Sequence, residues 1–180
     1  MSDDSDTPRV GGSPKTQAPR FNPLEARSSS APAHKWYAIF VSITSGFEGT
    51  RATIQKSYVV KEHFDEAVRL DPADATARHL LGLWFFEVAS LSWAARKLAA
   101  VIFAAPPAGS YREALEHFEA AETLDPGFWV ANRLYLGKSF LALGDRASGR
   151  SWLLRSLELA AGNDEDRRCH AEARAQLQKD

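Results

Sequence analysis

One ten-residue phrase occurs twice in this chain of 180 residues. It is HFDEAVRLDP at residues 63–72 and HFEAAETLDP at residues 117–126. His, Phe, Ala, Leu, Asp and Pro keep their positions in both copies. A phrase that recurs at this kind of separation is typical of stacked helical repeats, in which each unit buries its apolar face against the next. The sequence therefore predicts a repeat fold.

The spacing inside the phrase identifies the type of repeat. Phe, then Ala three residues later and Pro five beyond it, fit the second helix of a tetratricopeptide unit of about 34 residues. The first helix of such a unit carries Leu-Gly followed by an aromatic residue, which is found at 81–85 and again at 136–140. The copies lie further apart than one unit, which predicts an insertion between Glu87 and Ser110. We predict an all-α fold: a tetratricopeptide-like stack of antiparallel helix pairs (an α-solenoid) with a long helical insertion.

Composition divides the chain into two regions. Residues 1–33 contain five prolines and six serines and few apolar side chains, so they bury too little apolar area to offset the entropy of ordering. We predict a disordered Pro/Ser-rich tail at 1–33 and the repeat domain at 34–180. The tail has no apolar core of the kind that a secretory signal needs.

Helix boundaries follow from capping residues and prolines. We expect a short helix at HKWYAIFVSIT with a break at GFEGT, and a second helix over 51–70 that ends before Pro72. Asp74 is placed to cap the next helix, and Asn163 to cap a final helix that begins with three acidic residues.

The insertion is predicted to be one helix of 27 residues, from His79 to Ala105. Apolar residues repeat along it as in a heptad, at Val88, Leu91, Ala95, Leu98 and Ile102. The segment is long enough to cross a membrane. However, Glu87, Arg96 and Lys97 would then lie in the hydrocarbon at about 3 kcal/mol each. We therefore expect a packed helix and no transmembrane span.

Composition argues against several classes of function. The formal net charge is −1, which gives no overall basic surface for nucleic acid. The single cysteine, Cys169, excludes an internal disulfide and suits a reducing compartment. The five histidines do not have metal-ligand spacing, and the chain contains no glycine-rich phosphate loop. We predict no enzyme activity, no metal and no cofactor.

Several longer phrases resemble the regulator of microtubule dynamics family. They are HKWYAIF, IQKSYVVKEHFDEAVRLDP, ATARHLLGLWFFEVASLSWAARKLAA and SYREALEHFEAAETLDP, with LGKSF after them. The resemblance implies a cytoplasmic, non-catalytic helical adaptor associated with microtubules and spindle poles, and in some members with mitochondria. It also implies a further repeat before HKWYAIF, where this chain has its Pro/Ser-rich tail and no membrane anchor. One face of the helix of Trp36 should then be uncovered.

Two kinds of partner are considered, of which microtubules are implied by the resemblance alone. Microtubules or another protein could bind through basic side chains that meet tubulin's acidic tails, for which the candidates are Arg96, Lys97, Arg112, Arg133 and Lys138. Phospholipid is the alternative, held in an apolar groove beside the insertion and lined by Trp84, Phe85, Trp93, Ile102 and Phe103. Capture of an acidic chaperone tail, common among tetratricopeptide proteins, is disfavoured because His79 and Leu83 occupy two of the groove positions that would hold the carboxylate.

Overall fold

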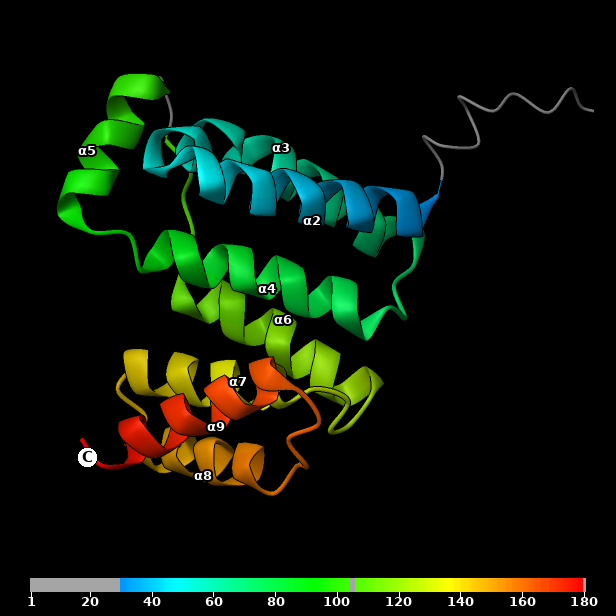
Figure 1. Cartoon of the computed structure of the whole chain (residues 1–180), viewed down its shortest axis with the longest axis vertical. Helices are drawn as coiled ribbons and strands as arrows, with labels where there is room; N and C mark the ends of the chain where they lie inside the picture. Colours follow the sequence, from blue (N-terminus) through cyan, green and yellow to red (C-terminus); the bar gives the residue numbers. More distant parts are fainter. Residues whose placement is uncertain (1–29, 104–105, 180) are drawn as a thin grey trace, which may run out of the picture.

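The computed structural model describes residues 30–103 and 106–179, and every regular element in this part of the chain is a helix (Figure 1). The helices are α2 (Ala31–Glu48), α3 (Thr50–Leu70), α4 (Ala75–Ala89), α5 (Trp93–Ile102), α6 (Tyr111–Leu124), α7 (Val130–Ala142), α8 (Arg146–Leu157) and α9 (Asp164–Leu177). Residues 1–29, which make up most of the predicted tail, lie outside the described residues.

The helices form a stack of pairs. α2 packs with α3, α4 with α6, and α7 with α8, while α9 lies against α7 and α8 at the end of the stack. Figure 1 shows α2 and α3 at one end and α8 and α9 at the other. The predicted tetratricopeptide-like stack is confirmed. The predicted insertion lies between α4 and α6, where α5 turns back to contact α3.

Close approach of the paired helices depends on the glycine of each Leu-Gly motif. A Cβ atom on Gly82 would lie 2.9 Å from Cε1 of Phe118, which is fully buried. A Cβ on Gly137 of α7 would lie 2.7 Å from Cγ of Leu153 on its paired helix α8. Neither glycine has a positive φ, so the motif requires glycine here for space and not for backbone conformation.

Side-chain caps fix where the helices begin. Asp74 accepts a hydrogen bond from the backbone N–H of Ala77, and Asn163 accepts one from that of Asp166, as predicted. Ser110 starts α6 with a reciprocal capping box, in which Glu113 returns a bond to the Ser110 backbone.

The prediction of one helix from His79 to Ala105 is wrong. α4 ends at Ala89, and α5 begins only at Trp93. Ser92 caps the start of α5, because its side chain accepts a hydrogen bond from the backbone N–H of Ala95. The Arg96 guanidinium then donates to the carbonyl oxygens of Ala89 and Leu91. These bonds satisfy carbonyls at the end of α4, so the chain can turn although the apolar repeat continues through the turn. Residues 104–105 lie outside the described part.

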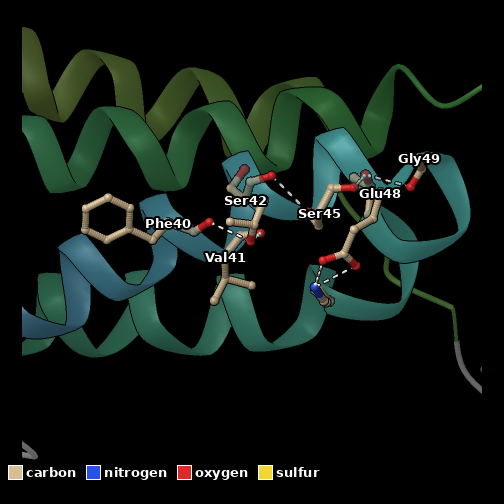
Figure 2. Close-up of polar contacts among 9 residues, drawn as sticks. Phe40, Val41, Ser42, Ser45, Glu48 and Gly49 are labelled. Atoms are coloured by element: carbon tan, nitrogen blue, oxygen red, sulfur yellow. Dashed lines mark hydrogen bonds and ion pairs between the residues drawn. The ribbon is translucent and has the colours of Figure 1, made fainter.

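The first described helix is longer than predicted. α2 begins at Ala31, slightly before His34, and continues through Gly46 and Phe47, which were expected to form a break. The break is Gly49 alone, with φ of 97°, a conformation that favours glycine. Lys56 of α3 forms an ion pair with Glu48 across this turn, at 2.8 Å (Figure 2). The turn is therefore short enough for α2 and α3 to pack along their lengths.

None of the helices in the described ranges combines the length and the apolar character needed to cross a membrane.

Candidate functional site

A largely apolar pocket of about 570 Å³ lies among α2, α3 and α4. Ala99 of α5 and Pro107 of the following loop also line it. Several hydroxyl groups in its wall bond to nearby backbone: Ser45 donates to the Ser42 carbonyl at 2.9 Å (Figure 2), and Ser57 donates to the Ile54 carbonyl at 2.7 Å. Because these polar atoms are already bonded, the pocket offers mainly apolar contact.

The five residues predicted to line a lipid groove do not share one surface. Trp84 lines the pocket and donates from Nε1 to the Ser57 carbonyl at 2.9 Å. Phe85 is buried, with its ring stacked on His117. Trp93 is 71% exposed. Phe103 packs edge-on against Tyr58, and the preceding residue, Ile102, is half-buried. The observed pocket thus lies on the α2 side of the insertion and includes one of the five.

The predicted basic residues also separate. Arg96 bonds to the backbone at the end of α4, as described above. Lys97 is exposed and lies over the ring of Trp93, 4.2 Å from its centroid. Arg112 is exposed in the first turn of α6. Lys97 and Arg112 therefore present charge to solvent.

The other two predicted basic residues are held inside the fold. Nε of Arg133 lies 2.9 Å from Oε1 of Glu122, and the Arg133 side chain is only 12% exposed. Lys138 pairs with Glu172 at 2.7 Å and lies over the ring of Tyr135. Both cations are compensated within the chain, which leaves little charge for a partner.

A basic surface that the sequence reasoning missed lies on α8. Arg146, Arg150 and Arg155 are exposed, and α8 contains no acidic residue. Within the described part of the chain, neither Arg146 nor Arg150 forms an ion pair, while Arg155 lies over the Trp152 ring at 4.0 Å. The signal was present as RASGRSWLLRSL, where three arginines occur without an acid.

An exposed apolar face runs along α2, as expected for the helix of Trp36. Trp36, Phe40 and Ile43 are each slightly more than half exposed, and Phe47 is 89% exposed. Tyr37, on the edge of this face, is half exposed and packs against His63.

His79 cannot serve as a surface ligand. It is buried, and its Nδ1 donates to Oδ1 of Asn132 at 3.0 Å. Burial lowers the pKa of His79 to about 4, partly offset by the bond to Asn132, so the ring is neutral at pH 7. A neutral, enclosed imidazole gives no means of binding a peptide carboxylate, which weighs further against chaperone-tail capture.

Residues 30–103 and 106–179 contain no group of three or more His, Cys, Asp or Glu side chains placed to hold a metal ion.

Comparison with known proteins gives a consistent picture. Residues 20–179 match the family model described as regulator of microtubule dynamics protein 1-3. Regulator of microtubule dynamics protein 1 of Mus musculus is 44% identical over 154 residues, which are 86% of this chain and 50% of that protein. The Homo sapiens protein 1 is 42% identical over 86% of this chain and 49% of its own length. Protein 3 of Xenopus laevis is 39% identical over 80% of this chain and 31% of its own.

A solved structure supports the fold. The type III secretion chaperone SycD of Yersinia enterocolitica, determined in complex with a peptide of the translocator YopD, superposes with a TM-score of 0.52. It is 18% identical, and the match covers 87% of this chain and 91% of that one. The chain spans about half the length of the protein 1 relatives it matches. Because the family match extends through all the described helices, the chain belongs to the regulator of microtubule dynamics family.

Proposed function

We propose that this chain is a non-catalytic helical adaptor that binds microtubules, with the exposed arginines of α8 as the main contact. The match of residues 20–179 to a family of microtubule regulators carries the proposal. That family is described by a regulatory role and not by a reaction, in agreement with the absence of catalytic motifs from the sequence. Microtubule binding would place the chain on the cytoskeleton; association with spindle poles or mitochondria rests on the resemblance alone.

Charge supports α8 as the contact. The net charge of the chain is −1, so attraction to an acidic partner such as the tubulin tails must come from a local surface. Arg146 and Arg150 are one turn apart on an acid-free helix, so a tail segment could meet both guanidinium groups at once. Exposed Leu154, between Arg150 and Arg155, adds an apolar contact.

Co-sedimentation of the full chain with stabilised microtubules, over a series of salt concentrations, tests the proposal. We expect pelleting that weakens as salt rises, because exposed charges are screened. Replacing Arg146→Glu and Arg150→Glu together should lower the affinity about tenfold. The matched control is Lys97→Glu with Arg112→Glu, which reverses two exposed charges elsewhere. Equal losses in both variants would remove α8 as the contact, and binding unaffected by salt would remove the electrostatic mechanism.

Phospholipid binding is a second candidate, favoured by the apolar pocket among α2, α3 and α4. Its volume of about 570 Å³ lies within the range of small-molecule sites, and acyl chains would match its lining. Native mass spectrometry after incubation with phosphatidylcholine liposomes tests it. Leu83→Trp, which fills the pocket, should abolish retained lipid, whereas Val101→Trp on the exposed side of α5 should not. A chain that retains no lipid and transfers none between liposomes would exclude this candidate.

A further inference from the structure

The apolar face of α2 has the spacing of a helix-pairing seam. Trp36, Phe40, Ile43 and Phe47 are separated by four, three and four positions, which is the alternation of a and d positions in a heptad. All four side chains are at least half exposed. Such a seam normally packs against another helix, and none of the described helices of this chain covers it.

The same face lacks free charge. The charged residues of α2 apart from His34 are Lys35, which pairs with Asp74, and Glu48, which pairs with Lys56. The positions that flank the seam are uncharged, and they include Tyr37, Thr44 and Gly46. Aromatic enrichment together with depletion of charge is characteristic of the core of a protein interface and not of a solvated surface.

The size of the face is sufficient for a partner. At roughly 150–250 Å² for each aromatic side chain, the exposed parts of the seam and Tyr37 amount to about 500–700 Å². The sequence of residues 1–29 offers little to cover it, because its large apolar side chains besides Met1 are Val10, Phe21 and Leu24. Four prolines are interspersed among these side chains in the sequence.

We propose that a second copy of this chain covers the face, through antiparallel pairing of α2 with α2. The spacing four-three-four is the same in both directions, so a two-fold axis between Phe40 and Ile43 brings the two seams into register. Trp36 then packs on Phe47 of the second copy, and Phe40 packs on Ile43 of the second copy. The interface is isologous, as in most homodimers.

Charge and area are consistent with this occupant. An antiparallel pair brings no unpaired like charges together, because Lys35 and Glu48 are each compensated within their own chain. Two faces bury about 1,000–1,400 Å² in total, at the lower end of specific interfaces, which is the size class of weak association. We therefore expect a dimer that dissociates in the micromolar range. A helix that lies on a membrane usually has several Lys or Arg on its polar face, and α2 has only the paired Lys35.

Sedimentation velocity of the full chain, from about 1 to 100 µM, tests the pairing over the concentrations at which a micromolar dimer dissociates. We expect a concentration-dependent shift from one to two copies. Phe40→Glu should weaken the association at least about tenfold, because it places two carboxylates beside the two-fold axis. The matched control is Val101→Glu on α5, where an 82% exposed side chain is replaced outside the seam. Circular dichroism of both variants verifies the helical fold.

A cysteine pair tests the geometry and does not depend on the stability of Phe40→Glu. Phe40→Cys combined with Ile43→Cys should give a covalent dimer on mild oxidation, since these positions face each other across the axis. Phe47→Cys alone should not, because it faces Trp36; cross-linking of Phe47→Cys would indicate parallel pairing and overturn the proposal.

Two further results would overturn it. One is an unsubstituted chain that stays monomeric at 100 µM. The other is a monomer that co-sediments with phosphatidylcholine vesicles through the seam, which would assign the face to a membrane. Microtubule binding by Phe40→Glu is expected to persist, because α8 lies at the other end of the stack (Figure 1). The proposed function and the pairing can therefore fail separately.

Discussion

Nδ1 of His79 lies 3.0 Å from Oδ1 of Asn132, and this bond joins α4 to α7 across two neighbouring repeats. Asn132 in turn donates from Nδ2 to the carbonyl oxygen of Phe118 on α6, at 3.1 Å. Both side chains are buried. One amide thus connects three helices, and the neutral form of the histidine is part of that connection.

Stability should therefore decrease in mild acid. Burial holds the pKa of His79 at about 4 in the folded chain, below the ordinary histidine value of 6.5 that applies to the unfolded chain. Between these values the unfolded chain binds a proton that the folded chain does not, so the free energy of unfolding falls as pH falls below 6.5. From pH 7.5 to pH 5 the loss from this residue should be about 2 kcal/mol.

Urea unfolding followed by circular dichroism at these two pH values measures the effect. Burial also lowers the pKa of His63 and of His117, so both add to the loss in the same direction. His79→Gln separates the contributions, because its amide can still donate to Asn132 but does not titrate. The difference in unfolding free energy between the two pH values should be smaller in this variant; an unchanged difference would show that His79 does not contribute.

Gly82→Ala should destabilise the chain by about 1–3 kcal/mol, because its Cβ would overlap the buried ring of Phe118. Gly46→Ala is the matched control, since no atom lies within 4 Å of its Cβ and its helix is otherwise regular. This control should stabilise the chain by about 0.5–1 kcal/mol, through the better helix propensity of alanine. Thermal unfolding of both variants at one protein concentration measures whether each substitution raises or lowers stability. Destabilisation by Gly46→Ala would contradict the explanation that steric overlap with Phe118 causes the loss in Gly82→Ala.

Arg133→Leu should lower the free energy of unfolding by about 3 kcal/mol, because it leaves the buried carboxylate of Glu122 without its cation. Adding Glu122→Gln removes the charge and should restore part of the stability. Urea unfolding of the single and double variants measures this. If Arg133→Leu weakened microtubule pelleting without changing stability, Arg133 would be a contact residue after all.

Ser92→Ala should loosen α5 selectively, because it removes the side-chain cap on the N–H of Ala95. The expected loss of about 1 kcal/mol corresponds to amide exchange about five times faster along α5. Hydrogen exchange of the same variant supplies its own control, since amides in α4 should be unchanged. Equal acceleration in both helices would indicate that the cap supports more than the insertion.

The sequence was sufficient to predict those parts of the fold that depend on local capping residues or on repeated motifs. The recurring phrase predicted the stack, the Leu-Gly motifs predicted the close helix pairs, and Asp74 and Asn163 were recognised as caps. The break after Ala89 was missed because the apolar heptad continues through it. Its determinants are a serine cap and an arginine that bonds to backbone carbonyls, neither of which changes the hydrophobic pattern.

The candidate sites were harder to predict, because they depend on which charges are compensated in three dimensions. Arg133 and Lys138 are as basic as Arg146 in the sequence, but Glu122 and Glu172 reach them from other helices. The pocket was likewise expected beside the insertion, whereas α2 and α3 form much of its wall. Ion-pair partners such as these are brought together only by helix packing. Residue type alone therefore could not distinguish a basic side chain that is paired within the chain from one that is available to a partner.

The positions of α2 and α8 at opposite ends of the stack have a consequence for avidity (Figure 1). Two chains joined at α2 would present their α8 surfaces at the far ends of an elongated particle. After one end binds an acidic filament, the other end experiences a high effective concentration of further binding sites, and residence time rises without any new contact. A particle of this shape could bridge two filaments or two places on one, and dilution below its dissociation constant would reduce it to a single-point ligand.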